Sequence, residues 1–285
     1  MAKYREDPMS AADLRKYLES QDDFGLELAI YAKARALGLP ATHGGTYEDS
    51  VTSKSRQYDV RAFAIQNECR IDLAIECKSL KSAYPLVLSQ IPRIDEESYH
   101  QVIWSYTRSA DFPFREIGPP SKTLTLRQTD GMYPIGAMVG KSTSQVGMTE
   151  KGDFTAGDSE VYEKWTQALG SAASLVQDAA YYEEASEGTF STVVLPFLVV
   201  ADGTLWTADY SSDGLLMGDP VQCTHTTLFV GRDYWRAGGI SYQISHLHVC
   251  TRKGMEEFLD RVALDQGLWD LLFPAVEIFE AAAAG

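Results

Sequence analysis

The sequence predicts an α/β fold in which a mixed β-sheet is flanked by helices. Residues 22–38 (DDFGLELAIYAKARALG) place most of their apolar side chains on one broad arc of a helix. Residues 70–78 alternate between apolar and polar side chains, which is the pattern of a strand with two different faces. Helical and strand segments recur to the end of the chain, so we expect a layered α/β domain.

The N-terminal part is predicted to form two helices and a hairpin. A capping box begins a short helix over residues 10–19. A second helix occupies 22–38, with acidic residues in its first turn and Gly and Pro at its end. Strands follow at about 57–66 and 70–78, and a tight turn at Asn67-Glu68 joins them into a hairpin.

The rest of the chain is predicted to divide into an insertion and a C-terminal extension. Residues at about 79–157 are rich in Pro, Gly, Ser and Thr, which predicts an insertion of loops and short elements that forms a lid or contacts substrate. One helix is expected inside it, at 95–109. A long helix at 159–184 and a strand at 192–201 return to the core. The extension at about 203–285 is predicted to add a hairpin partner for that strand, two further strands and two helices.

Composition limits the class of protein. The 285 residues are 45% hydrophobic, enough for one large core, so we expect residues 1–285 to form a single domain. No apolar run of about 18 residues occurs, which argues against a membrane span. The charged N-terminus lacks the apolar segment of a signal peptide, so a cytoplasmic location is expected. The four cysteines are scattered and are expected to be buried thiols, neither disulfides nor zinc ligands.

Charge is distributed unevenly along the chain, whose formal net charge is −15. Residues 51–127 carry 11 Lys or Arg against 9 Asp or Glu, whereas residues 150–285 carry 7 against 21. Phosphate binding needs Lys and Arg. The mildly basic segment therefore permits local contact with nucleic acid, and the acidic C-terminal half suits a basic protein partner.

A cluster of charged side chains is predicted at one end of the hairpin. With a turn at 67–68, opposed residue numbers sum to 135, which places Asp59 across from Glu76 with Cβ atoms about 5 Å apart. Lys78 shares their face by alternation. Glu27 falls inside the apolar arc of its helix, so its carboxylate is expected to face inward. Burying such charges is costly unless something binds them.

The residue types in this cluster indicate metal chemistry. Two carboxylates that share a site repel each other, and a divalent cation removes the conflict. Mg²⁺ prefers oxygen and is typically held by one or two carboxylates, with waters and substrate phosphate oxygens. An adjacent lysine adds positive charge for an attacking water or a phosphate. These groups are suited to metal-assisted phosphodiester hydrolysis.

The series resembles the PD-(D/E)XK nuclease superfamily, in which a helical Glu precedes a hairpin that carries an Asp and a (D/E)xK. Glu27, Asp59 and Glu76-Cys77-Lys78 have that order. The resemblance implies a restriction-endonuclease-like mixed β-sheet core flanked by helices, with the insertion after the ExK strand, and a nuclease, most often a DNA endonuclease. It implies Mg²⁺ or Mn²⁺ on Asp59, Glu76 and the carbonyl of Cys77. Lys78 would orient or deprotonate water, and Glu27 would hold a second metal or its water.

The resemblance covers about residues 20–80 and has two departures. Tyr58 stands where the family name has Pro, and the next core helix begins about eighty residues after Lys78. That helix contains Gln177 and Tyr181, which are spaced as in the QxxxY of RecB-like members. Nucleases that resemble this chain often form dimers and often serve in restriction or antiviral defence, so the resemblance implies a homodimer and such a role by analogy alone.

Basic residues near Asp59 are the expected contacts to nucleic acid. Lys54, Arg56 and Arg61 flank Asp59 and are the candidate phosphate contacts, with DNA as the expected partner. A non-catalytic protein of the same fold, which serves as a binding or assembly subunit, is the alternative function.

A histidine metal site is a third interpretation. His246 and His248 share one face of a predicted strand, with His225 nearby, and three histidines can hold Zn²⁺ or Fe²⁺. We favour structural or surface histidines in an edge strand.

Overall fold

The computed structural model describes residues 7–20, 23–49, 52–106, 121–127, 131–157, 159–179, 189–235 and 241–274. The helices are α1 (Ala11–Ser20), α2 (Asp23–Ala36), α3 (Ser159–Ala179), α4 (Arg252–Leu264) and α5 (Gln266–Leu272), with a 3₁₀ helix at Asp95–Glu97. The strands are β1 (Ala41–His43), β2 (Thr46–Glu48), β3 (Ser55–Gln57), β4 (Val60–Gln66), β5 (Cys69–Lys78), β6 (Leu86–Pro92), β7 (Tyr99–Tyr106), β8 (Ser121–Arg127), β9 (Met138–Met148), β10 (Phe154–Gly157), β11 (Thr189–Val200), β12 (Leu205–Asp209), β13 (Val221–Gln222), β14 (His225–Trp235) and β15 (Ser241–Thr251).

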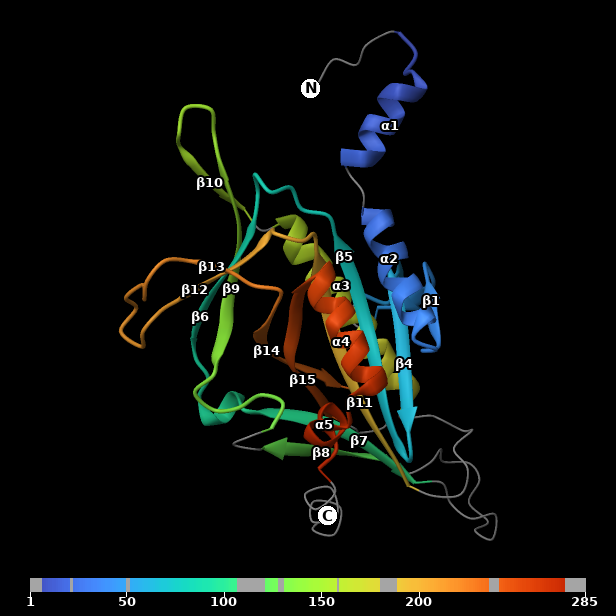
Figure 1. The fold of residues 1–285 in the computed structure, drawn as a ribbon. Helices are drawn as coiled ribbons and strands as arrows, with labels where there is room; N and C mark the ends of the chain where they lie inside the picture. The colour runs from blue at the N-terminus through green and yellow to red at the C-terminus, as the bar shows by residue number, and fades with distance from the viewer. Residues whose placement is uncertain are drawn as a thin grey trace.

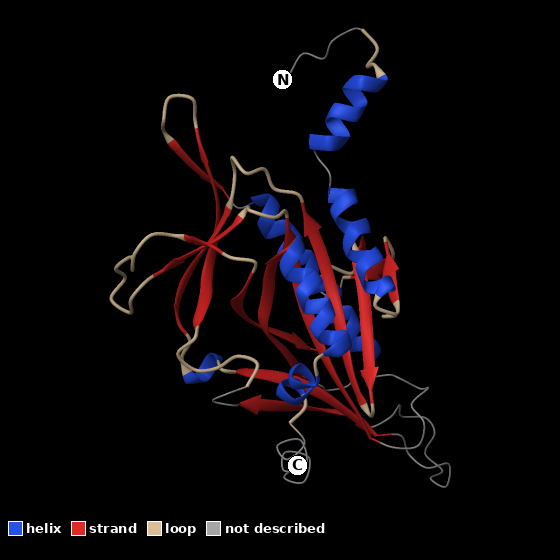
Figure 2. Ribbon diagram, in the orientation of Figure 1, coloured by secondary structure: helices blue, strands red, loops and turns tan. Residues whose placement is uncertain are grey.

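One large mixed sheet organises the molecule, and helices cover it (Figure 1; Figure 2). Its 13 strands include the path β1-β4-β5-β11-β15-β14-β9-β6-β12-β13, with β10 added on β9, and with β7 on β11 and β8 on β7. Strands β2 and β3 form a separate pair. The predicted class, a mixed α/β sheet flanked by helices, is confirmed.

Strands β4 and β5 form the predicted hairpin in the predicted register. Val60 pairs with Ile75 and Gln66 with Cys69, in antiparallel orientation, so opposed residue numbers sum to 135. The turn residue Asn67 has a φ of 53°, a left-handed conformation that asparagine adopts more readily than most residues. A slip of one residue would move every side chain of the strand to the other face. The position of the acidic pair therefore depends on this turn.

The central strands run parallel and bury different side chains on their two faces. Strand β11 pairs in parallel with β5 and with β15, which brings the carboxyl ends of all three strands to one edge. On one face, Ile75 of β5 lies in a core with Ile30 of α2. On the other face, Ala74 packs with Ala172 of α3. Glu76, two residues beyond Ala74, therefore points towards α3.

The region 79–157 is not an assembly of loops and short elements, and that prediction was wrong. It supplies β6 to β10, all of them part of the main sheet. Strand β6 pairs along its length with β9, whose Thr and Val residues suit a strand. Two of the prolines that suggested loops, Pro85 and Pro92, lie at the margins of β6, where proline is tolerated.

Two local predictions were also wrong because distant partners decided the structure. The helix expected at 95–109 is the short 3₁₀ helix followed by β7, which pairs with β8 and β11. Residues 95–97 are acidic and resemble a helix N-terminus, but the aromatic and β-branched residues that follow them suit a strand. Strand β12 was expected to pair with β11 through Asp202-Gly203, yet it pairs with β6 and β13.

Some of the predicted features lie at residues outside the described ranges. Helix α3 is seen to Ala179, so Tyr181 and the QxxxY spacing lie outside the described residues, as does the chain after residue 274. Within the described ranges no helix has the length and apolar content needed to cross a membrane. The four cysteines are free thiols as predicted; Cys77 and Cys250 are fully buried, and Cys69 and Cys223 partly.

Candidate active site

The two acidic residues predicted to meet do meet at the carboxyl end of β5. Asp59 precedes β4, and its backbone N–H donates to Oε1 of Glu76 at 3.4 Å. The backbone N–H of Cys77 donates to Oδ2 of Asp59 at 2.8 Å. The Glu76 side chain is fully buried, and that of Asp59 is 13% exposed. The hairpin therefore holds one carboxylate in place with backbone hydrogen bonds beside a second one that has no access to solvent.

A lysine that the sequence analysis did not identify lies between these carboxylates. Lys164, on the second turn of α3, places Nζ 2.8 Å from Oδ2 of Asp59 and 3.5 Å from Oε2 of Glu76. It comes from the helix that packs on this face of β5, and its side chain is 20% exposed. One ammonium thus neutralises part of the charge of two carboxylates.

The electrostatics of the three groups follow from burial and proximity. Burial first, and then the charge of Asp59, raises the pKa of Glu76 well above its ordinary value, although Lys164 lowers it. Burial alone would lower the pKa of Lys164, but Asp59 and Glu76 together raise it above its ordinary value. The ammonium is therefore charged at all physiological pH, whereas the buried Glu76 holds a proton more readily than an ordinary glutamate.

Glu27 lies beside this group but has its own partner. Its carboxylate, on α2, is 14% exposed and hydrogen-bonded to His43 Nε2 of β1 at 2.9 Å. Burial, followed by the charge of Asp59, raises the pKa of Glu27, while His43 and Lys164 act in the opposite direction. Glu27 is thus close enough to interact electrostatically with Asp59, and it faces inward as predicted.

Lys78 does not join the acidic pair. Its Nζ lies 3.3 Å from Oδ2 of Asp23 and 3.4 Å from Oε2 of Glu160. Asp23, the first residue of α2, also accepts a hydrogen bond from the backbone N–H of Ser79. The predicted cluster of Asp59, Glu76 and Lys78 is therefore corrected, since the ammonium that contacts both carboxylates belongs to Lys164. Alternation gave the face of Lys78 but not the acids on two neighbouring helices that hold its side chain.

The three predicted phosphate contacts are in different situations. Lys54 is exposed. Arg56 forms an ion pair with Asp49 at 3.4 Å. Arg61 donates to the Ser171 hydroxyl at 3.0 Å and to its backbone carbonyl at 3.1 Å, with its guanidinium 4.3 Å from the ring centroid of Tyr58. Arg61 thus ties β4 to α3, because odd-numbered residues of β4 face that helix.

The acidic pair offers donor atoms that suit a hard cation, and the ammonium of Lys164 lies between them. Asp59 and Glu76 offer the carboxylate oxygens that Mg²⁺ prefers. Among the residues that the structure describes, no group of three or more His, Cys, Asp or Glu is placed to hold a metal ion. Lys164 Nζ instead provides the positive charge between the two carboxylates. A divalent ion at this point requires displacement of the ammonium.

Two of the three histidines, His246 and His248, are buried, and His225 is exposed. His225 Nε2 lies 2.9 Å from Nδ1 of His248, whose Nε2 lies 2.8 Å from the Tyr133 hydroxyl. Arg93 Nε donates to Nε2 of His246 at 3.3 Å. The hydrogen bonds occupy both ring nitrogens of His248, so the geometry favours a structural role. Strand β15 lies between β11 and β14, and the expectation of an edge strand was wrong.

Burial keeps His246 and His248 neutral and predicts loss of stability in acid. Burial, and then Arg93, lowers the pKa of His246 to about 2, and burial and neighbouring charges lower the pKa of His248. An unfolded histidine titrates near 6.5, so the unfolded state binds the extra proton below that pH. Stability present above pH 6.5 is therefore lost as pH falls, by about 2 kcal/mol for His246 between pH 7.5 and 5.

The variant His246→Asn isolates this effect, because Glu76 and Glu27, whose raised pKa values act in the opposite direction, are common to both proteins. Its stability deficit relative to wild type, measured by urea unfolding, should shrink by about 2 kcal/mol from pH 7.5 to pH 5. A deficit that is the same at both pH values would contradict a neutral, buried His246.

Comparisons of the chain with protein-family models, with curated proteins and with solved structures found no match. Three of the site's residues besides Lys164 escaped the sequence analysis: His43, the partner of Glu27, and Asp23 and Glu160, the partners of Lys78. The acidic first turn of α2 was the only signal for Asp23, and it indicates a helix start in most chains.

Proposed function

We propose that the chain is a metal-dependent phosphodiester hydrolase of the PD-(D/E)XK type that acts on DNA as an endonuclease. One observation carries the proposal: Asp59 and Glu76 meet at the end of β5 with a cationic group, Lys164, between their carboxylates. The order α2, hairpin β4–β5, helix α3 and parallel strand β11 supports a restriction-endonuclease-like core.

The roles of the residues follow from their positions. Asp59 and Glu76 would hold Mg²⁺ or Mn²⁺, with the Cys77 carbonyl as the further ligand that the resemblance implies. Such an ion supplies Lewis-acid activation of a phosphoryl oxygen and of a water molecule. Lys164 or Lys78 would neutralise the charge that develops on the phosphate, and Glu27, hydrogen-bonded to His43, would accept or hold a water proton.

A cleavage assay tests the proposal. Supercoiled plasmid is incubated with wild type and with Asp59→Asn, Lys78→Ala and Asp219→Asn, in Mg²⁺, in Mn²⁺ and in chelator. Wild type should nick or linearise the plasmid in either metal and not in chelator. Asp59→Asn should fall below about one hundredth of the wild-type rate, because it weakens a metal ligand. Asp219→Asn is the matched control, because Asp219 is an exposed loop residue that is distant in sequence from the candidate site.

The outcomes separate the site from the activity. Cleavage that survives in Asp59→Asn would exclude this site, and loss in Asp219→Asn would point to a general defect. Loss in Lys78→Ala with an unchanged fold would show that Lys78 leaves Asp23 and Glu160 to take part in catalysis.

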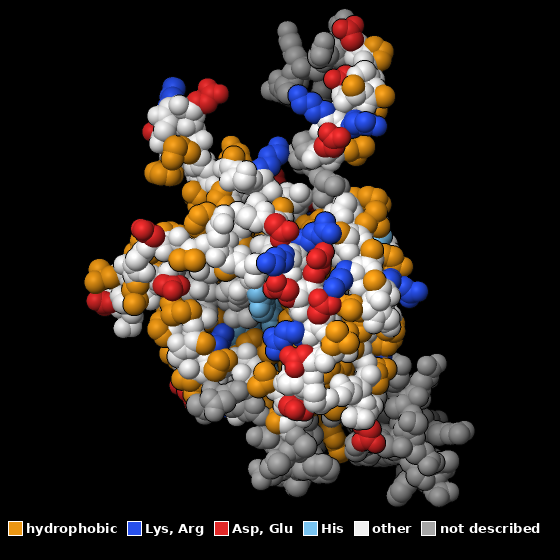
Figure 3. Space-filling view, in the orientation of Figure 1, with side chains coloured by type: hydrophobic (Ala, Val, Ile, Leu, Met, Phe, Trp, Pro, Cys, Tyr) orange, Lys and Arg blue, Asp and Glu red, His pale blue; other side chains and the backbone are white. Residues whose placement is uncertain are grey.

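A non-catalytic scaffold is the second candidate, and Lys164 favours it. An ammonium that partly neutralises both carboxylates gives a stable site without any metal. Acidic and basic side chains are interspersed over the region of α4 in Figure 3, where Arg252 and Arg261 pair with acids one turn away. A scaffold would neither cut plasmid nor gain thermal stability from Mn²⁺.

A further inference from the structure

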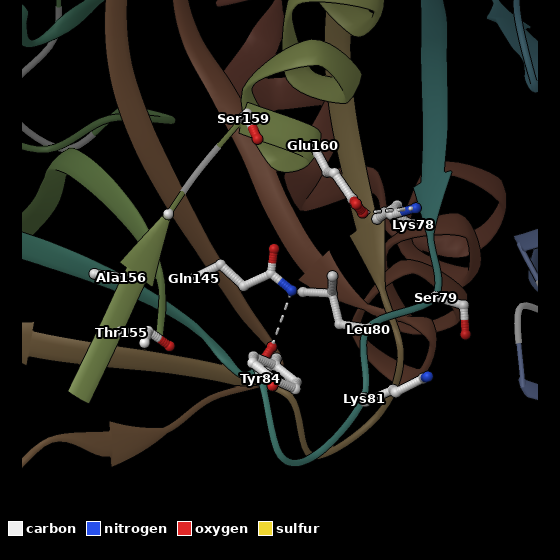
Figure 4. Close-up of a pocket in the computed structure, with 11 residues that line it drawn as sticks. Lys78, Ser79, Leu80, Lys81, Tyr84, Gln145, Thr155, Ala156, Ser159 and Glu160 are labelled. Carbon is white, nitrogen blue, oxygen red and sulfur yellow. Dashed lines mark hydrogen bonds and ion pairs between the residues drawn. The ribbon is translucent and has the colours of Figure 1, made fainter. Parts of the chain in front are cut away.

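A cavity of about 460 Å³ opens beside the candidate active site, at the point where β5 ends. Three parts of the chain form its walls: the segment that follows β5, the β9–β10 hairpin and the first turn of α3 (Figure 4). Lys78 lines it. Alternation puts Lys78 on the same face of β5 as Glu76, about 7 Å further along the strand. The cavity is thus next to the acidic pair and separate from it.

The lining combines positive charge, an aromatic ring and an amide. Lys78 and Lys81 come from the end of β5 and the segment after it, and Tyr84 is an aromatic residue that is 46% exposed. A Cβ at Gly147 of β9 would lie 2.3 Å from that ring, so the absence of a side chain there is what lets Tyr84 lie against the hairpin. Gln145 projects into the cavity and donates to the backbone carbonyl of Tyr84 at 3.4 Å.

We propose that this cavity binds an unpaired nucleotide of single-stranded DNA, next to the phosphate that the acidic pair addresses. The inference rests on the proposed function and names its substrate as DNA with a single-stranded segment at the cleavage point. Exposed aromatic rings stack on bases of any sequence, lysines contact the phosphates, and an amide can hydrogen-bond a base edge.

The size of the cavity favours an unpaired nucleotide over a duplex. About 460 Å³ lies within the range of sites that enclose one small molecule. A duplex would need an open groove, whereas the β9–β10 hairpin here closes one side. Glu160 is the one acidic side chain on the described lining, and it is already paired with Lys78. That ion pair is partly exposed, since Glu160 is 71% exposed, so a phosphate can replace it.

The test is a binding measurement without cleavage. Fluorescence anisotropy in chelator compares labelled oligothymidine of about a dozen nucleotides with a blunt duplex of equal length, for wild type and three variants. Thr155→Glu puts a negative charge on the cavity wall, and Tyr84→Ala removes the ring. Ser144→Glu adds the same charge at an exposed position of β9. Ser144 is next to Gln145 in sequence, so its side chain lies on the opposite face of the strand.

The expected result is preference of wild type for the single strand, with binding weakened about tenfold by Thr155→Glu and by Tyr84→Ala. Ser144→Glu should stay within about twofold of wild type because its charge lies outside the cavity. Equal affinity for duplex and single strand, or equal effects of Thr155→Glu and Ser144→Glu, would overturn the proposal.

The measurement is independent of the cleavage assay. A protein that cuts plasmid but binds both DNA forms equally would retain the nuclease function and lose this substrate assignment. A protein that cuts nothing but binds the single strand in a Thr155-dependent way would retain the cavity assignment and lose the nuclease. Absence of binding to either DNA would overturn the cavity assignment, whatever the plasmid shows.

Discussion

Replacing Lys164 with methionine is expected to lower the free energy of unfolding by about 3 kcal/mol at pH 8, because removal of one partner leaves a buried charge uncompensated. Methionine keeps most of the volume and the apolar stem, so lost packing contributes little. Glu76 has no exposed surface, and the charge of Lys164 lowers its pKa. Asp59 loses its partner at 2.8 Å in the same variant.

The stability deficit of Lys164→Met is expected to depend on pH. The pKa of Glu76 is already raised above 4.5 in the folded protein, and without Lys164 it rises further. Below pH 4.5 both the folded and the unfolded carboxyl are protonated, so the variant there lacks only the contact to Asp59. At pH values above the wild-type pKa of Glu76, the wild-type carboxylate is charged and paired with Lys164, whereas the variant carboxyl keeps its proton or buries an uncompensated charge. The deficit therefore grows as pH rises through that pKa. Urea unfolding at pH 5 and pH 8 measures this difference.

Two further variants show whether the carboxylate pair is the cause. Lys253→Met removes an exposed lysine of α4, whose partner Glu257 lies 3.8 Å away, and should change stability by less than about 0.5 kcal/mol. Glu76→Gln in the Lys164→Met background should restore most of the loss at pH 8, because the buried charge is gone. A Lys164→Met deficit that is equal at both pH values, or that Glu76→Gln leaves unchanged, would show that Lys164 acts through packing.

The hairpin that positions the acidic pair could be predicted because its signals are local. Alternation along β5 gave the faces, and Asn67, which adopts a positive φ, marked the turn. Together these two features determine the register, and with it the contact between Asp59 and Glu76. The sequence between residues 57 and 78 contains all the information that this part of the site requires.

The identity of the lysine could not be predicted because its signal is not local. Lys164 reaches the acidic pair only because α3 packs on the face of β5 that carries Ala74. Within α3, Lys164 is one of the polar residues of an amphipathic helix, and its local sequence does not distinguish it from other lysines. Lys78, adjacent to the pair in sequence, is drawn to Asp23 and Glu160, which belong to α2 and α3. Pairing between distant strands likewise decided β7, in the segment 95–109 where a helix was predicted.

Metal affinity distinguishes a metal-dependent nuclease from a non-catalytic scaffold, and Lys164→Met is the variant that tests it. Any divalent ion that binds Asp59 and Glu76 has to displace an ammonium that lies 2.8 Å from one carboxylate and 3.5 Å from the other. Lys164→Met removes that competitor and leaves the oxygen donors in place. At pH 8 the variant should therefore bind Mn²⁺ at least about tenfold more tightly than wild type, as measured by calorimetry. Bound metal should also recover part of the lost stability, because an ion that binds only the folded state stabilises it.

The carboxylates themselves provide the control for this prediction. Asp59→Asn combined with Lys164→Met retains Glu76 but lacks the charge of the first donor, and it should show neither tight Mn²⁺ binding nor a metal-dependent rise in melting temperature. Lys78→Met, whose ammonium lies on Asp23 and Glu160, should leave Mn²⁺ affinity within about threefold of wild type, because it does not compete at the pair. If Lys164→Met bound no Mn²⁺, the carboxylate pair would be a structural ion pair with its lysine, and the scaffold would be the better account of the chain. Tight binding that depends on Asp59 would instead show that an ammonium occupies a site built for a metal.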